Sequence, residues 1–301
     1  MIEIISKIFI KDRKNYDSPA VRRAYGIICS ACGIALNILL CVFKLAASSF
    51  TGSVAIAVDA LHNLTDSASS AVSLLSFLLS GQKKTKKFPL GKGRIEYIAG
   101  FIIAIVLIAT GIEAAKSSVT KIINPEPVTF SAVSVLLLAV SVVTKFYMAH
   151  FNSRYGKKIS SAALKASAAD CLCDSISTLI AIISVVSVRF TALNIDAWGG
   201  LAVSMFILFA GIKSATDTTR LIIGTPPDED TITEITKTLL LFPEIDDVCN
   251  IFLHDYGPEN SILDIKVKFR DGLTLADTSD AVDRSSQQIT STTGYHVQIV
   301  I

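Results

Sequence analysis

The sequence predicts an α-helical polytopic membrane protein with six transmembrane helices, followed by a small α+β cytoplasmic domain. Hydrophobic residues make up 51% of its 301 residues and charged residues only 18%, whereas about 25% charge is usual for soluble domains. The deficit of charge is confined to the part of the chain before residue 225, and the remainder is ordinarily polar. We therefore expect a membrane domain over 25–225 and a separate domain over 226–301.

Six apolar segments are each long enough to cross a hydrocarbon core of about 30 Å. Their predicted bounds are 25–50, 53–80, 95–122, 128–150, 159–188 and 193–222. Basic residues crowd the link after the second segment, the link after the fourth segment and the first two dozen residues, whereas the other links are nearly uncharged. By the positive-inside rule, both termini are expected in the cytoplasm. Residues 1–24 are then a cytoplasmic lead without the features of a cleavable signal peptide.

The C-terminal part is predicted to form a domain of its own, because Pro226 and Pro227 end the sixth apolar segment. The elements expected after them are helices over 228–241 and 275–292 and strands over 247–254, 261–269 and 296–301. This α-β-β-α-β order predicts a small α+β fold of ferredoxin-like kind. A domain of about 75 residues is only marginally stable by itself, so we expect it to dimerise.

Two apolar segments are interrupted by pairs of residues that can bind metals. The second segment carries His62 and Asp66, and the fifth carries Asp170 and Asp174. On a helix, a spacing of four residues places both side chains on one face, about 6 Å apart along the axis. A charged group at membrane depth costs roughly 2.5–3.5 kcal/mol, which favours a functional role for it.

The predicted topology allows the two pairs to meet. The second and fifth segments run antiparallel, and Asp66 and Asp174 lie about 20 Å and about 24 Å from the outer ends of their helices. These depths agree within the uncertainty of the helix ends. We therefore predict one site for a divalent cation with four ligands, His62, Asp66, Asp170 and Asp174.

Other polar residues in the apolar segments allow a purely structural interpretation. Lys44 on the first segment is a rival partner for the aspartates. Asp59 shares a helix face with His62 and is expected to support the ligands or to lie along the ion path. Lys145 lies near the cytoplasmic end of the fourth segment, where we expect its long side chain to extend to the membrane surface.

The same residues carry a resemblance to the cation diffusion facilitator family. Ala57–Asp66 resembles the family's second-helix signature, and Asp170 with Asp174 matches its counterpart on the fifth helix. Phe88–Glu96 is similar to the loop that follows the second helix, and Leu253–Pro258 resembles the first hairpin of the family's cytoplasmic domain. This resemblance implies a homodimer in the plasma membrane that exports divalent metal from the cytosol in exchange for protons.

The chain departs from the family pattern at positions that commonly hold regulatory metals. In the cytoplasmic domain, positions that are often histidine are occupied by Cys249, Lys266 and Ser279. Metals that bridge a dimer in the family's usual way are therefore not expected. Cys249 and His254 remain weak candidates for a cytoplasmic metal site, against the simpler expectation of a buried cysteine and a histidine in a turn.

The ligand set makes protons direct competitors of the metal, because metal binding requires a neutral imidazole and ionised carboxylates. His62 is the expected proton carrier near neutral pH, since the reference pKa of imidazole is about 6.5. One nitrogen with three carboxylates favours manganese or iron, and zinc stays possible because most sites bind it more tightly. Apart from the transported metal, we expect no cofactor, and we expect no nucleic-acid partner.

Two other functions remain open. An intramembrane aspartyl-type enzyme would need one catalytic aspartate on each of two helices with a glycine nearby, whereas each segment here carries a pair of ligands. A proton-independent metal channel would suit a ring of carboxylates, but a tight tetrahedral set binds too firmly for fast conduction. We therefore predict a transporter and not an enzyme, and proton dependence of the metal flux distinguishes it from a channel.

Overall fold

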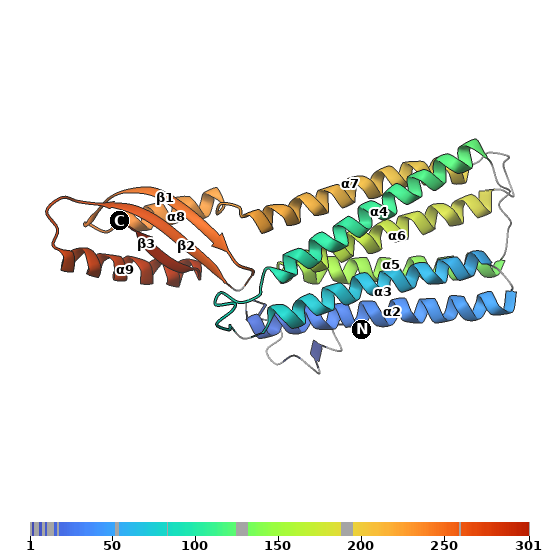
Figure 1. Ribbon diagram of the computed structural model, residues 1–301, viewed down its shortest axis with the longest axis horizontal. Helices are drawn as coiled ribbons and strands as arrows, with labels where there is room; N and C mark the ends of the chain where they lie inside the picture. Colours follow the sequence, from blue (N-terminus) through green and yellow to red (C-terminus); the bar gives the residue numbers. More distant parts are fainter. Residues whose placement is uncertain are drawn as a thin grey trace. The chain divides into compact units, whose positions relative to one another are not determined.

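The chain divides into two compact units, residues 1–81 with 95–219 and residues 82–94 with 220–301. Figure 1 shows the computed structural model, which describes residues 2, 6–7, 10, 15–16, 18–51, 54–82, 84–124, 132–187, 195–258 and 260–300. The boundary predicted between residues 225 and 226 lies close to the start of the second unit's main part. The sequence did not indicate that the 82–94 loop belongs with that unit.

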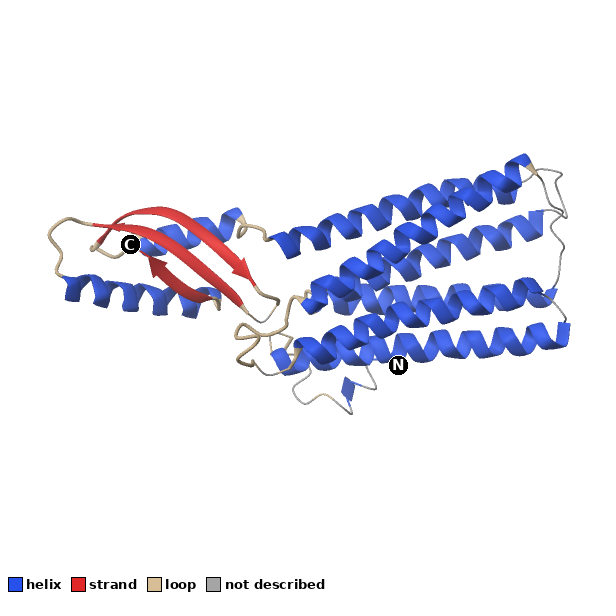
Figure 2. Ribbon diagram, in the orientation of Figure 1, coloured by secondary structure: helices blue, strands red, loops and turns tan. Residues whose placement is uncertain are grey.

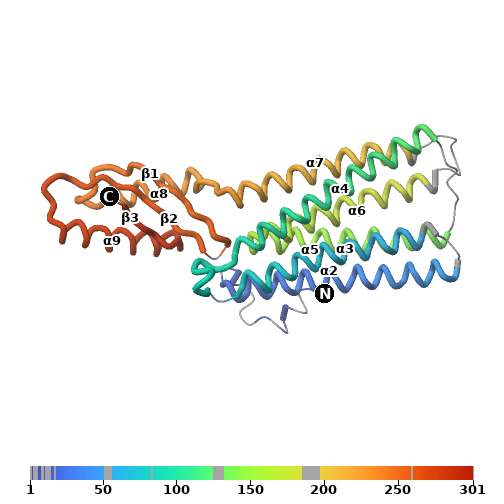
Figure 3. The backbone as a smooth tube through the Cα atoms, in the orientation of Figure 1, coloured from blue at the N-terminus to red at the C-terminus, as the bar shows by residue number. Residues whose placement is uncertain are grey.

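The first unit is a bundle of long helices that run up and down side by side (Figures 1 and 3). They are α2 (Pro19–Thr51), α3 (Val54–Ser80), α4 (Ile95–Ile123), α5 (Ala132–Lys158), α6 (Ala162–Ser187) and α7 (Ile195–Ile223). The C-terminal ends of α2, α4 and α6 lie at the same end of the bundle as the N-terminal ends of α3, α5 and α7 (Figure 3). We call this end the distal end.

Five of these helices are long and apolar enough to cross a membrane. The exception in the described chain is α3, which is 27 residues long but is made less hydrophobic by polar residues. Many of these polar residues are buried in the bundle, among them Asn63, Asp66 and Ser73. Phe43 and Phe209, by contrast, are more than half exposed on the outside, as expected for side chains that face lipid. The predicted α-helical membrane domain is confirmed.

Helix α2 begins at Pro19, six residues before the predicted start at residue 25. The reason is local, since proline is favoured in the first turn of a helix, where its missing N–H costs nothing. Helix α5 extends to Lys158, eight residues past the predicted end at residue 150. A tight turn at Ile159–Ser161 then leads into α6, with Ser160 at a φ of 49°.

Packing of the bundle depends on close contacts between neighbouring helices. Gly26 of α2 lies directly against the ring of Phe77 on α3, where an added Cβ would come within 2.4 Å of a ring carbon. Phe77 belongs to a buried cluster with Cys29, Met148 and Leu164, which come from α2, α5 and α6. These contacts hold together the helices that carry the polar residues of the bundle interior.

A buried ion pair links the non-distal ends of several helices. The Arg22 Nη2 donates to both carboxylate oxygens of Glu96 at 2.8 and 2.7 Å, and its Nε donates to the backbone oxygen of Ile159 at 2.8 Å. Both charged side chains are almost fully buried. The pair therefore ties the start of α2 to the start of α4 and to the turn between α5 and α6.

The second unit contains a three-stranded sheet and two helices (Figure 2). Its elements are α8 (Glu229–Leu239), β1 (Ile245–Asp255), β2 (Ser261–Phe269), α9 (Leu275–Thr293) and β3 (His296–Val300). The strand order is β1-β2-β3, with β1 antiparallel and β3 parallel to β2. Leu239, Leu263 and Ile289 lie at the centre of its core. The predicted α-β-β-α-β order is confirmed.

The 82–94 loop packs against the turn between β1 and β2, within the second unit. The Arg94 Nε donates to the Asp255 backbone oxygen at 2.7 Å, and its guanidinium lies 4.6 Å from the centre of the Tyr256 ring. Gly257 has a φ of 117°, and a Cβ there would come within 2.4 Å of the Gly93 Cα. Glycine is therefore required at Gly257 both by its backbone conformation and by the close approach of the loop.

Candidate metal centre

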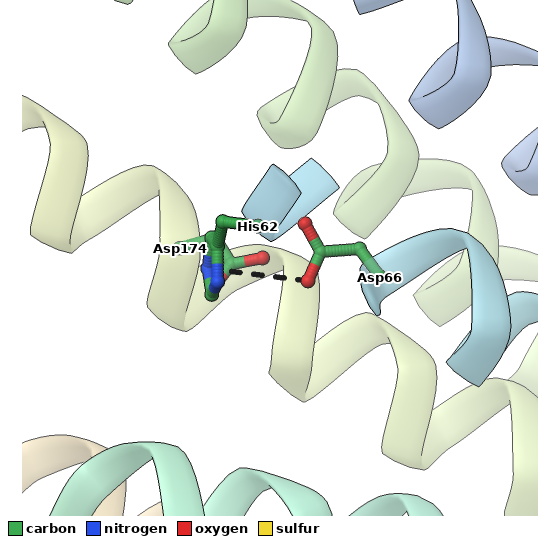
Figure 4. Close-up of side chains that lie close together, drawn as sticks. All are labelled: His62, Asp66 and Asp174. Carbon is green, nitrogen blue, oxygen red and sulfur yellow. Dashed lines mark ion pairs between the residues drawn. The ribbon is translucent and has the colours of Figure 1, made fainter. Parts of the chain in front are cut away.

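Three of the four predicted ligands come together inside the bundle (Figure 4). His62 and Asp66 lie one turn apart on α3, and Asp174 reaches them from α6. The His62 Nε2 lies 4.0 Å from Asp66 Oδ1 and 3.7 Å from Asp174 Oδ1. One ligand atom from each residue lies within 4.8 Å of the other two. We call these three residues the ligand cluster.

The members of the ligand cluster differ in exposure. The side chain of His62 is 45% exposed, against 8% for Asp66 and 12% for Asp174. The two carboxylates are thus largely withdrawn from solvent, and a buried charge is stable only when it is paired. A divalent ion bound about 2.1 Å from each ligand atom would satisfy both carboxylates after a small contraction of the cluster.

A lysine that the sequence did not assign to the site also reaches the ligand cluster. The Lys145 Nζ, on α5, donates to Asp66 Oδ2 at 2.5 Å and to Asp174 Oδ2 at 2.7 Å. Its side chain is only 4% exposed. The expectation that Lys145 extends to the membrane surface is therefore wrong. The sequence could have indicated this contact, because a lysine in an apolar segment needs an oppositely charged partner just as the aspartates do.

Asp170 lies outside the ligand cluster in the described structure. It is buried one turn from Asp174 on the same helix and interacts electrostatically with Asp174, Asp66 and Lys145. Its role as fourth ligand stays a prediction. Asp59 is also outside the cluster, because its Oδ2 pairs with Lys44 Nζ at 2.7 Å. Lys44, the expected rival partner for the ligands, is therefore engaged with a different aspartate.

A cavity of about 480 Å³ adjoins the ligand cluster. His62, Asp174 and Lys145 line it, together with residues nearer the distal end of the bundle such as Asp59 and Glu113. Asn63 and Ser141 line it too, and among the described residues no hydrogen-bond partner is found for Asn63 Nδ2 or Ser141 Oγ. The cavity therefore offers polar groups to a hydrated ion on its way to or from the cluster.

The weak cytoplasmic candidates are not close to each other. Cys249 and His254 both lie on β1, where five residues span about 16 Å, too far to share an ion within one chain. Cys249 is exposed, at a bulge between Val248 and Asn250, and His254 lies within the strand with Nε2 3.9 Å from Asp264 Oδ2. The expectations of a buried cysteine and of a histidine in a turn are therefore wrong.

Comparison with known proteins identifies the family. Residues 30–223, more than half of the chain, match the cation efflux transmembrane domain. An uncharacterized transporter of Methanocaldococcus jannaschii is 25% identical over 74% of this chain and 78% of its own length. The magnetosome protein MamB of Magnetospira sp. is 26% identical over 66% of this chain and 68% of its own length. The manganese efflux system protein MneS of Bacillus subtilis is 26% identical over 58% of this chain and 60% of its own length.

These matches confirm the resemblance carried by the motifs. The bundle has helices of membrane-spanning length and hydropathy, and the relatives include proteins that are named for cation or manganese efflux. The protein is therefore a member of the cation efflux (cation diffusion facilitator) family, an integral membrane transporter that exports metal cations.

Proposed function

We propose that the protein exports a divalent metal cation from the cytosol in exchange for protons, with His62, Asp66 and Asp174 as ligands. The observation that carries this proposal is the ligand cluster, whose three ligand atoms lie within 4.8 Å of one another inside the bundle. An imidazole nitrogen and carboxylate oxygens are a donor set that suits divalent transition metals. Asp170 is the proposed fourth ligand, recruited as α3 and α6 close around the ion.

The cavity supports a direction of release. Its lining residues beyond the ligand cluster, among them Asp59 and Glu113, come from the parts of α3 and α4 nearer the distal end, which is the outer side in the predicted topology. In this arrangement the metal leaves through the cavity, and protons that enter by the same route compete for the ligand atoms it vacates. His62 is the first ligand that they reach, because it lines the cavity and is the most exposed of the three.

Manganese or iron is the proposed cargo, with zinc as the alternative. Carboxylate oxygens outnumber imidazole nitrogens in the cluster, and oxygen ligands favour these harder ions. The name of the manganese efflux relative from Bacillus subtilis agrees with this choice.

We also propose that the protein forms a homodimer in the plasma membrane, with both termini in the cytoplasm. The basic links of the membrane domain support this orientation. The small size of the C-terminal unit supports dimerisation through it, as do its exposed apolar side chains, among them Leu241 and Phe252.

Metal uptake into proteoliposomes tests this function. The full-length protein is reconstituted, and the accumulation of Mn²⁺, Fe²⁺, Zn²⁺ and Mg²⁺ is followed with and without an acidic lumen. We expect Mn²⁺ or Fe²⁺ to accumulate only when the lumen is acidic. Asp66→Ala and Asp174→Ala are expected to abolish accumulation, whereas Asp217→Asn, which alters an exposed aspartate on α7, is expected to leave it intact.

Two results would contradict the proposal. Metal flux that ignores the pH gradient would indicate a channel in place of an antiporter. Undiminished accumulation by folded Asp66→Ala and Asp174→Ala proteins would remove the ligand cluster from the transport path.

A further inference from the structure

The contacts of Lys145 raise a question that the proposed metal site does not answer. The two carboxylates of the ligand cluster turn their Oδ1 atoms toward His62 Nε2 and their Oδ2 atoms toward Lys145 Nζ. An ammonium group therefore already lies where the negative charge of the cluster is concentrated. A divalent ion would have to bind next to it or displace it.

The charges in this region do not balance. With the His62 imidazole neutral, as metal binding requires, the carboxylates of Asp66 and Asp174 are matched by only one positive charge, the ammonium of Lys145 that they share. Two like charges held close together repel strongly where little water screens them. The ammonium shared by Asp66 and Asp174 offsets this repulsion. A bound divalent ion would offset this repulsion as well, so either cation can stabilise the two carboxylates.

The structure also gives the ammonium room to move. Lys145 lines the 480 Å³ cavity together with Ser141, whose Oγ has no hydrogen-bond partner among the described residues and can accept from the ammonium. Glu113 lines the same cavity. A lysine side chain has a flexible four-carbon stem, so its head group can swing from the carboxylates into this polar space without rearrangement of α5.

We propose that Lys145 is a tethered counter-cation, whose ammonium holds Asp66 and Asp174 together in the metal-free carrier and is displaced into the cavity by the incoming divalent ion. The proposal rests on the proposed function, because it concerns the same ligand cluster. Its consequence is that Lys145 weakens metal binding and speeds metal release. A lysine that merely positions the carboxylates would have the opposite effect, since its loss would weaken metal binding.

Equilibrium binding of Mn²⁺ to the full-length protein in lipid nanodiscs, at one fixed pH, tests this. Lys145→Met removes the charge and nearly keeps the length of the side chain, and we expect it to tighten Mn²⁺ binding by about tenfold or more, as close charge pairs commonly require. In proteoliposomes the same variant is expected to show a lower KM and a lower kcat, because release becomes slower. Lys145→Gln keeps an N–H donor, and we expect it to change affinity in the same direction to a smaller extent.

Lys44→Met is the matched control. Lys44 is also a buried membrane lysine paired with an aspartate, but its partner Asp59 lies outside the ligand cluster. A general gain of negative charge would tighten binding in both lysine variants alike, whereas displacement predicts a clear gain only at Lys145. Equal tightening in the two variants would therefore overturn the proposal.

The remaining outcomes are also decisive. Unchanged or weaker Mn²⁺ binding by folded Lys145→Met protein overturns the proposal, while loss of binding in Asp174→Ala still supports the metal site itself. If Asp174→Ala binds Mn²⁺ as tightly as the wild type, the proposed function fails and not merely the role of Lys145. If neither neutral variant folds but Lys145→Arg does, Lys145 has a structural role and the proposal is wrong.

Discussion

Two buried ion pairs in the helical bundle are built from similar residues but with different charge balance. At the non-distal end, one guanidinium meets one carboxylate, and the Arg22 Nη2 donates to both carboxylate oxygens of Glu96. In the ligand cluster, one ammonium is shared by Asp66 and Asp174, a third aspartate lies nearby, and a cavity adjoins the site. The first arrangement is matched in charge, whereas in the second two carboxylates share one ammonium whenever His62 is neutral.

The difference shows which buried ion pairs of a membrane bundle join helices and which can bind a further cation. A matched pair has no net charge that another ion could neutralise, so its role is to hold helices together. An unmatched set beside a cavity gains stability from any further cation that reaches it. Charge balance around a buried pair therefore indicates function better than burial alone does.

The largest expected effect is on stability, at the matched pair. Glu96→Gln leaves the Arg22 guanidinium buried without its counter-charge, and we expect a loss of about 3–5 kcal/mol. Thermal unfolding of the purified protein in detergent measures this loss. Lys116→Gln, at an exposed position of the same helix, is the control and is expected to change the midpoint little. A small change in Glu96→Gln would show that the matched pair does not stabilise the bundle.

The same measurement at the ligand cluster sharpens the comparison. Asp174→Asn removes one of two carboxylates that share Lys145, so one ammonium and one carboxylate remain matched. We expect a loss of at most about 1 kcal/mol in thermal unfolding, although metal transport is lost. A destabilisation as large as that of Glu96→Gln would mean that Asp174 has a structural role equal to that of Glu96.

A smaller effect is expected on metal preference. His62→Asp replaces the nitrogen ligand with an oxygen, which favours harder ions, and we expect the ratio of Mn²⁺ to Zn²⁺ transport to rise about tenfold. The pH dependence of transport should shift as well, because the imidazole is gone. Proteoliposome assays with both metals over a range of pH check this, with His150→Asp on α5 as control. An unchanged metal profile and pH optimum would exclude His62 as a ligand.

The smallest effect is expected in the C-terminal unit, where an exposed pair contrasts with both buried ones. The Arg284 Nη2 donates to Glu244 Oε1 at 2.6 Å, and this hydrogen bond lowers the pKa of Glu244 below its usual value of 4.5. The stabilisation is therefore fully present above about pH 4.5 and is lost as the pH falls through the lower, folded-state pKa.

Arg284→Gln tests this pH dependence. Hydrogen exchange of α9 in the full-length protein should be slightly faster in Arg284→Gln than in the wild type at neutral pH, and the difference should vanish in strong acid. Lys237→Gln on α8 is the control for loss of a surface charge. A difference that persists at low pH would mean that Arg284 acts by packing and not through Glu244.

The sequence predicted the helices, the C-terminal elements and the pairs on α3 and α6, because these follow from local patterns. It did not predict contacts that depend on which way a side chain points. Lys145 meets partners 29 and 79 residues away, and the apolar and polar residues of α5 are spread so evenly around it that no helix face is marked as inward. The contact between Arg94 and Asp255 spans 161 residues, and although both residues lie in motifs that resemble the family's, no local pattern pairs one with the other.

The uneven exposure of the ligand cluster sets an order of events for an approaching ion. In the proposed transporter, a hydrated cation that enters the cavity from the outer side meets the half-exposed imidazole before the withdrawn carboxylates. It must therefore exchange its first water for nitrogen. Mg²⁺ loses water reluctantly and prefers oxygen, so it is turned away at this first exchange. In the proposed transporter, the histidine thereby hinders the return of Mg²⁺ from the outer side through the cavity.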